Sequence, residues 1–182
     1  AGDYGDWTIG NNIETDDNPL LRGTRDKPIR IQKFGDGDVN FNSIEIHGDY
    51  FWFHDVKVGA GGIRGDNDHW PVGVTLTKVS SKGAYYTIHG EGYEWNALDF
   101  DIGGVEGGDI TKEGIQWALG TRGHVGAFGK IARTQDSWSY GNGNIDMHNN
   151  YHVLTGDNVV EPDYSQDNFR IWDNFAWNGE PR

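Results

Sequence analysis

A pattern of strand, short polar corner and second strand recurs five times, and it constrains the fold of this 182-residue chain more than any other feature. The copies cover residues 43–58, 87–100, 117–128, 145–154 and 169–177, with corners near positions 47, 89, 120, 148 and 172. The corners are therefore 42, 31, 28 and 24 residues apart, as expected for stacked coils that carry loops of different length. Within the strands, apolar and polar positions alternate, so one face of each strand belongs to a core. We predict an all-β fold, a right-handed parallel β-helix, with a jelly-roll β-sandwich as the alternative.

Stacking of such coils also predicts the domain organisation and an inward row of side chains. We expect a single all-β domain over residues 1–182, with residues 1–28 as an N-terminal capping segment and about five coils between 29 and 178. The predicted inward row consists of Ile46, Ile88, Ala118, Met147 and Ile171. His47, His89 and His148 would then be equivalent outward positions. Side chains on a ladder run parallel and do not converge as zinc ligands must, so we expect a polar ladder there.

Composition and charge limit the partners. The chain has 28 Asp and Glu against 15 Lys and Arg, a net charge of −13, and no basic stripe. We therefore expect neither a nucleic acid nor a membrane surface as partner. No run approaches the ~18 apolar residues of a membrane span, and the absence of Cys excludes disulfides and thiolate catalysis. The start Ala1-Gly2-Asp3 is typical of a mature N-terminus, from which we expect a secreted, extracellular protein.

Several segments resemble a known enzyme family. Residues 23–32, Gly-Thr-Arg-Asp-Lys-Pro-Ile-Arg-Ile-Gln, resemble the turn that leads into the first strand of many β-helix polysaccharide lyases. Residues 119–130 and 145–151 are similar to two coils of alginate lyases and chondroitinase B, polysaccharide lyase family six. Residues 167–171, Asp-Asn-Phe-Arg-Ile, resemble that family's acidic-x-x-Arg-Ile strand. The resemblance covers short patches between residues 20 and 178, and it implies a lyase that cleaves an acidic, uronate-containing polysaccharide by β-elimination.

The resemblance also implies the chemistry of the site. In that family, Ca²⁺ or a basic side chain neutralises the uronate carboxylate, and a Lys or Arg removes the C5 proton. The family's Lys base and its partner Arg come from coils beyond the acidic-x-x-Arg-Ile strand, so neither has a counterpart here. Lys130 and Arg133 are the substitutes that we predict as catalytic residues. On a regular strand these two would face opposite sides unless a turn intervenes.

Acidic clusters predict sites for Ca²⁺, which prefers oxygen ligands. Residues 65–69 bring Asp66 and Asp68 together in one loop, and Asp99 and Asp101 would share a face if their strand is continuous. Paired carboxylates at this spacing also suit a glycosidase. Asp167 is the acidic residue that the resemblance assigns to Ca²⁺. We therefore predict Ca²⁺ as a structural or catalytic ion, with these five carboxylates as candidate ligands.

Tryptophans and one arginine predict substrate contacts. Flat indole faces stack on sugar rings, and Trp70, Trp138 and Trp172 lie in or beside presumed loops. Arg122, from the segment 119–130, completes the predicted substrate-binding set. Two other functions stay open. One is a non-catalytic, lectin-like jelly-roll module that binds carbohydrate. The other is a structural solenoid that associates end to end into filaments through open sheet edges.

Overall fold

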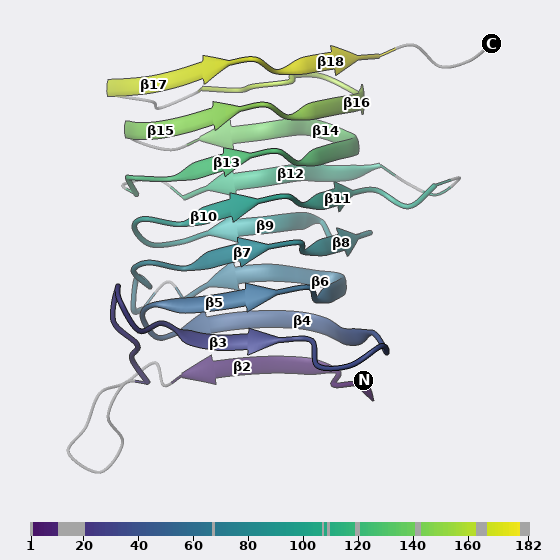
Figure 1. Ribbon diagram of the computed structural model, residues 1–182. Coiled ribbons are helices and arrows are strands. Elements are labelled where there is room, and N and C mark those ends of the chain that lie inside the picture. The colour runs from purple at the N-terminus through teal and green to yellow at the C-terminus, as the bar shows by residue number, and fades with distance from the viewer. Residues whose placement is uncertain are drawn as a thin grey trace.

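The chain forms a β-solenoid of parallel strands. A computed structural model describes residues 2–10, 21–66, 68–106, 108, 110–118, 121–140, 143–162 and 167–178, so Leu119 and Gly120 of the family-like segment lie outside the described residues. The strands stack into about 6 turns (Figure 1), which confirms the predicted parallel β-helix. The number of turns exceeds the predicted number by about one. Within the described ranges, the structure contains no helix with the length and apolar character of a membrane span.

Seven strands make the first wall of the solenoid, and each pairs in parallel with its neighbours. In chain order they are β3 (Ile29–Gln32), β5 (Phe51–His54), β7 (Thr75–Thr77), β10 (Asn96–Leu98), β13 (Val125–Ala127), β15 (Gly143–His148) and β17 (Asp167–Trp172). In Figure 1 they form the column of short arrows that rises from β3 to β17.

The second sheet has eleven strands and bends into two walls. The strands are β1 (Gly2–Asp3), β2 (Asp6–Gly10), β4 (Val39–His47), β6 (Lys57–Gly65), β8 (Ser80–Lys82), β9 (Tyr86–Gly90), β11 (Asp101–Gly103), β12 (Thr111–Trp117), β14 (Lys130–Tyr140), β16 (Tyr151–Thr155) and β18 (Phe175–Trp177). The second wall contains β8, β11, β16 and β18, and the third wall contains β9 and β12. The long strands β4, β6 and β14 run through both walls. The first part of β14 pairs with β11 and β16 in the second wall, and its later part pairs with β12 in the third wall. Because β1 and β2 pair with β4, strands of the solenoid already occur within the predicted capping segment 1–28.

Left-handed backbone corners frame the first wall at a constant interval. Six of its strands are bounded by two residues that are five positions apart and have φ between 49° and 80°; in β15 and β17 the first of the two is the second residue of the strand. The pairs are Tyr50 and Asp55, Gly73 and Lys78, Glu94 and Asp99, Gly123 and Phe128, Asn144 and Asn149, and Asn168 and Asp173. Gly, Asn and Asp fill eight of these twelve positions, since they adopt this conformation at the smallest steric penalty. The second residues of successive pairs are 23, 21, 29, 21 and 24 residues apart, and this spacing is the length of one turn of the solenoid.

The predicted inward row is wrong, because it joins residues from two different walls. Met147 and Ile171 are paired in the first wall, whereas Ile46 and Ile88 belong to β4 and β9 of the third wall. The corner after Ile46 ends a third-wall strand, and the corner after Met147 ends a first-wall strand. The observed first-wall row is Ile31, Phe53, Leu76, Ala97, Gly126, Met147 and Ile171. The third-wall row is Ile44, Ile63, Ile88, Ile115 and Trp138. For the same reason His47, His89 and His148 do not form one ladder.

Large aromatic side chains fill the interior beside glycines. Trp138 is 1% exposed, and a Cβ placed on Gly126 would lie 2.1 Å from two atoms of its ring. Gly90 leaves similar room for Trp117, where a Cβ would lie 2.2 Å from the ring. The prediction that Trp138 binds substrate is therefore wrong: its indole faces pack in the core and are out of reach of a polysaccharide.

Candidate functional site

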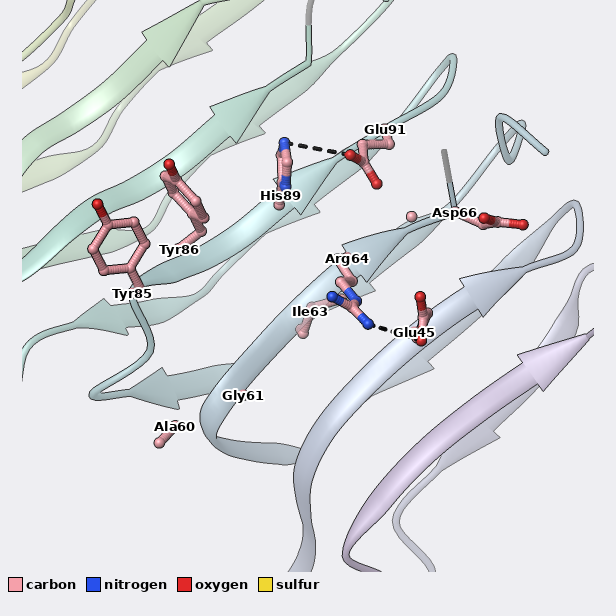
Figure 2. Close-up of a pocket in the computed structure, with 11 residues that line it drawn as sticks. Glu45, Ala60, Gly61, Ile63, Arg64, Asp66, Tyr85, Tyr86, His89 and Glu91 are labelled. Atoms are coloured by element: carbon pink, nitrogen blue, oxygen red, sulfur yellow. Dashed lines mark ion pairs between the residues drawn. The ribbon is translucent and has the colours of Figure 1, made fainter. Parts of the chain in front are cut away.

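Three hollows adjoin one another on the outside of the second and third walls. The lysine hollow, of about 640 Å³, is lined by side chains that include Lys82, Asp101, Val105, Glu106, Lys130 and Arg133. The middle hollow, of about 560 Å³, is lined by Tyr85, Val105, Ile110, Thr111, Lys112 and Gln135, among others. The histidine hollow, of about 350 Å³, includes Glu45, Arg64, Tyr85, Tyr86, His89 and Glu91 (Figure 2). Val105 is shared by the first two hollows and Tyr85 by the last two, so the three follow one another over the surface.

The lysine hollow brings together the two predicted catalytic residues. Lys130 begins β14 on the exposed face, in register with Asp101 of β11 and Tyr151 of β16. Arg133 follows three residues later with φ 56°, and this left-handed turn ends the regular alternation of the strand. Both side chains therefore line the same hollow. On a regular strand they would face opposite sides, and the turn at Arg133 brings them to one side. The turn is held by a hydrogen bond in which Nη2 of Arg133 donates to the carbonyl of Gly108 at 2.9 Å.

The charge of the lysine hollow is positive. Lys82, Lys130 and Arg133 supply three cationic groups against the carboxylates of Asp101 and Glu106. One pair is satisfied internally, because Nζ of Lys82 lies 2.6 Å from Oδ1 of Asp101. The remaining excess suits an anionic group such as a uronate carboxylate, whose charge the hollow can neutralise before any bond changes.

The histidine hollow has a different character. Figure 2 shows Tyr86, His89 and Glu91 near Arg64 of β6 and Glu45 of β4. Nη2 of Arg64 lies 3.0 Å from Oε2 of Glu45, and Nε2 of His89 lies 3.7 Å from Oε1 of Glu91. Burial, with a smaller contribution from the Arg64 charge, lowers the pKa of His89 to about 4. The imidazole is therefore neutral at neutral pH and can accept a proton or a hydrogen bond.

Carboxylates outnumber cations in the histidine hollow. Glu45, Asp66 and Glu91 face a single arginine, Arg64. Asp66 is almost fully buried, accepts the backbone N–H of Asp68 at 3.0 Å, and lies 2.9 Å from Nδ1 of His47. Such a hollow favours hydroxyl-rich neutral groups over uronates, because a second carboxylate would meet like charges there.

The predicted calcium ligands do not converge on one site. Asp66 lines the histidine hollow, Asp68 is exposed beyond it, and Asp167 begins β17 in the first wall. The prediction that Asp99 and Asp101 share a strand face is wrong, because Asp99 is the left-handed corner between β10 and β11. In the part of the chain that the structure describes, no three His, Asp or Glu side chains are placed to hold a metal ion. The five carboxylates therefore do not fit a common calcium site.

The three remaining predicted substrate contacts lie away from the hollows. Trp70 is 39% exposed and packs against Tyr93 with ring centroids 5.6 Å apart. Trp172 is 40% exposed on the first wall and stacks on His148 at 4.3 Å. Arg122 is exposed in the turn before β13. None of these three residues lines a hollow described above, so they offer separate surfaces.

Several residues of the hollows were not predicted as site residues, among them Lys82, Tyr85, Tyr86 and Lys112. Tyr85 and Tyr86 lie in a stretch whose alternating pattern predicts a strand, and that pattern does not reveal the neighbouring coils. Lys112 follows 26 residues after Tyr86, and only the parallel pairing of β9 with β12 brings them together. Comparison of the chain with protein-family models, with curated proteins and with solved structures gave no match.

Proposed function

We propose that the protein is a secreted polysaccharide lyase that cleaves a uronate-containing chain by β-elimination in the lysine hollow. One observation carries the proposal: the left-handed turn at Arg133 places Arg133, Lys130 and Lys82 around one hollow of about 640 Å³. A cluster of cations around a surface hollow is the arrangement that an acidic sugar requires. The resemblance of residues 23–32 to β-helix lyases supports the same substrate class.

The proposed reaction assigns a role to each basic side chain. Arg133 and Lys82 face the uronate carboxylate and stabilise the negative charge that develops when C5 loses its proton. Lys130 accepts that proton as the uncharged amine and becomes an ammonium group. The electron pair of the C5–H bond then forms the C4=C5 double bond, the C4–O bond breaks, and the departing oxygen takes a proton from the Lys130 ammonium. The hydrogen bond from the Arg133 guanidinium to the Gly108 carbonyl restricts the position of this side chain beside the carboxylate.

The direct test is turnover of uronate polymers. Wild-type protein is mixed with alginate, pectate or chondroitin, with and without Ca²⁺, and the absorbance of the conjugated double bond is followed. We expect product with at least one polymer. Lys130→Gln should lower the rate about 100-fold or more, the usual contribution of a general base. Arg133→Gln should also lower it, while circular dichroism confirms that both variants fold.

Lys57→Gln is the matched control. Lys57 is an exposed lysine of the same wall, paired with Asp38 at 2.7 Å and outside the lysine hollow, so its replacement should leave the rate unchanged. The proposal fails if no polymer gives new absorbance under any condition, or if Lys130→Gln retains the wild-type rate.

A non-catalytic carbohydrate-binding function is the second candidate. It is favoured by Trp172, whose ring is stacked on His148 and yet 40% exposed on the first wall, as a sugar platform requires. Retention on a polysaccharide column without turnover, lost in Trp172→Ala and kept in Lys130→Gln, would support this function over the lyase.

A further inference from the structure

The middle hollow is lined by side chains that, apart from Val105, do not line the lysine hollow. It lies between Tyr85, which precedes β9, and Val105, which follows β11, and it shares Val105 with the lysine hollow. We propose that the middle hollow is a second uronate subsite, which binds the neighbouring sugar of the same polysaccharide through Lys112 and Tyr85. This inference rests on the proposed function for the identity of the polymer, and on the residues below for the subsite itself.

Lys112 supplies the positive charge. Its Nζ lies 5.5 Å from the ring centroid of Tyr85 and 5.6 Å from that of Tyr86. The interaction with Tyr86 raises the pKa of Lys112, so the ammonium stays charged. Among the described residues that line this hollow there is no Asp or Glu, and Lys112 makes no ion pair with the described part of the chain. Glu113, whose carboxyl interacts with the Lys112 charge, is buried on β12 and does not line the hollow, so an anionic ligand would meet Lys112 without meeting a carboxylate among the described lining residues.

Tyr85 supplies a flat apolar surface. It is 62% exposed, and its ring stands at 84° to that of Tyr86 with the centroids 4.7 Å apart (Figure 2). Val105 and Ile110, the other large apolar side chains of the hollow, are also exposed by about half. An aromatic ring with apolar neighbours and one cation matches a uronate, which has a C–H face and a carboxylate.

Thr111 lines the middle hollow with the small exposed part of its side chain. It is 5% exposed, and its hydroxyl is shielded from solvent and has no hydrogen-bond partner among the described residues. Contact with a ligand therefore falls to the exposed side chains of the hollow. Gln135, which is exposed in the same hollow, adds an amide that can donate and accept.

The order of the hollows defines how the polymer would lie. Cations occur in the lysine hollow at Lys130 and Arg133 and in the middle hollow at Lys112, whereas the histidine hollow beyond Tyr85 carries three carboxylates. Consecutive uronates would therefore occupy the first two hollows. The sugar that reaches the histidine hollow would present hydroxyl groups to Glu45 and Glu91.

The test measures binding of galacturonate and mannuronate ligands by calorimetry, with the free monosaccharide and the hexasaccharide of each. We expect Lys112→Gln to weaken binding of the hexasaccharide about tenfold, as loss of one charge-assisted hydrogen bond does. The monosaccharide, which occupies the lysine hollow alone, should bind to this variant as tightly as to the wild type. Tyr85→Leu should weaken the hexasaccharide to a similar extent, while Tyr85→Phe and the control Lys57→Gln should not.

The outcomes separate this inference from the proposed lyase activity. If the wild type cleaves a uronate polymer but Lys112→Gln leaves hexasaccharide affinity and KM unchanged, the subsite is refuted and the lyase stands. If no polymer is cleaved while hexasaccharide binding depends on Lys112, the lyase is refuted and the subsite stands. Failure of the wild type to bind any of these oligosaccharides overturns the subsite.

Discussion

Acid should destabilise the solenoid through its buried imidazoles, and His124 provides the sharpest case. The ring is fully buried and stacks on Trp117 at 4.4 Å. Its Nδ1 accepts the backbone N–H of Trp95 at 3.3 Å, so the ring proton resides on Nε2, which donates to Thr121 Oγ1 at 2.8 Å. A second proton on Nδ1 would face the Trp95 N–H. Burial accordingly lowers the pKa of His124 to about 3.

The size of the effect follows from the two pKa values of His124. The folded value of about 3 lies below the unfolded value of 6.5, so the contribution to stability is complete above pH 6.5 and falls away as pH drops toward 3. Each pH unit between those values corresponds to ~1.4 kcal/mol, which gives ~5 kcal/mol over the whole range. Between pH 7 and pH 5 the protein should lose ~2 kcal/mol of unfolding free energy through this residue.

The assay is urea unfolding of the wild type and of His124→Phe at pH 7 and pH 5. The phenyl ring keeps the stacking on Trp117, and any loss of hydrogen bonds affects both pH values alike. We expect the wild type to lose ~2 kcal/mol more than the variant on acidification. Equal losses in the two proteins would refute the reasoning. If the variant does not fold, NMR of the wild type decides the matter, because the His124 ring signals should not titrate between pH 8 and pH 4.5.

Three further predictions concern the core and a buried carboxyl. Gly126→Ala places a Cβ against Trp138 and should lower the free energy of unfolding by ~1–3 kcal/mol. Trp138→Phe in the same chain should recover part of that loss, and Gly156→Ala, whose Cβ would meet its nearest atom at 3.6 Å, should change little. Asn150→Ala removes hydrogen bonds to two buried backbone groups and should lower the same quantity by ~2–4 kcal/mol in urea unfolding. Burial raises the pKa of Glu113 to about 7, so its contribution to stability is complete below pH 4.5 and is lost as pH rises through 7. Glu113→Gln should therefore gain stability relative to the wild type between pH 5 and pH 8; a constant difference would contradict this.

The fold class was predictable because alternation and polar corners are local properties of the sequence. The register was not, because strands of the first and third walls end alike. Ile46-His47-Gly48 and Ile88-His89-Gly90 close third-wall strands, whereas Met147-His148-Asn149 closes a first-wall strand. The constant five-residue interval between left-handed corners distinguishes first-wall strands from third-wall strands. The sequence does not reveal every corner, because Tyr50 and Phe128 occupy such positions in place of Gly, Asn or Asp.

The site was predictable only in part, for related reasons. Lys130 and Arg133 stand out as a pair of cations, but the left-handed turn that unites them occurs at an arginine, which gives no sign of it in the sequence. The burial of Trp138 depends on space left by Gly126 in another wall. Lys112 and Tyr85 come from different coils, so their proximity is a property of the stacked fold.

Product analysis in water enriched in ¹⁸O tests the central claim most directly. Elimination breaks the C4–O bond without adding solvent oxygen, so the new non-reducing ends should carry a C4=C5 double bond, and mass spectrometry should find no added ¹⁸O. Lys130→Gln should give at most a trace of this product, while Lys57→Gln should match the wild type. Saturated fragments that each contain one solvent oxygen would show hydrolysis, and intact polymer would show no cleavage. Either result would contradict a β-elimination lyase in the lysine hollow.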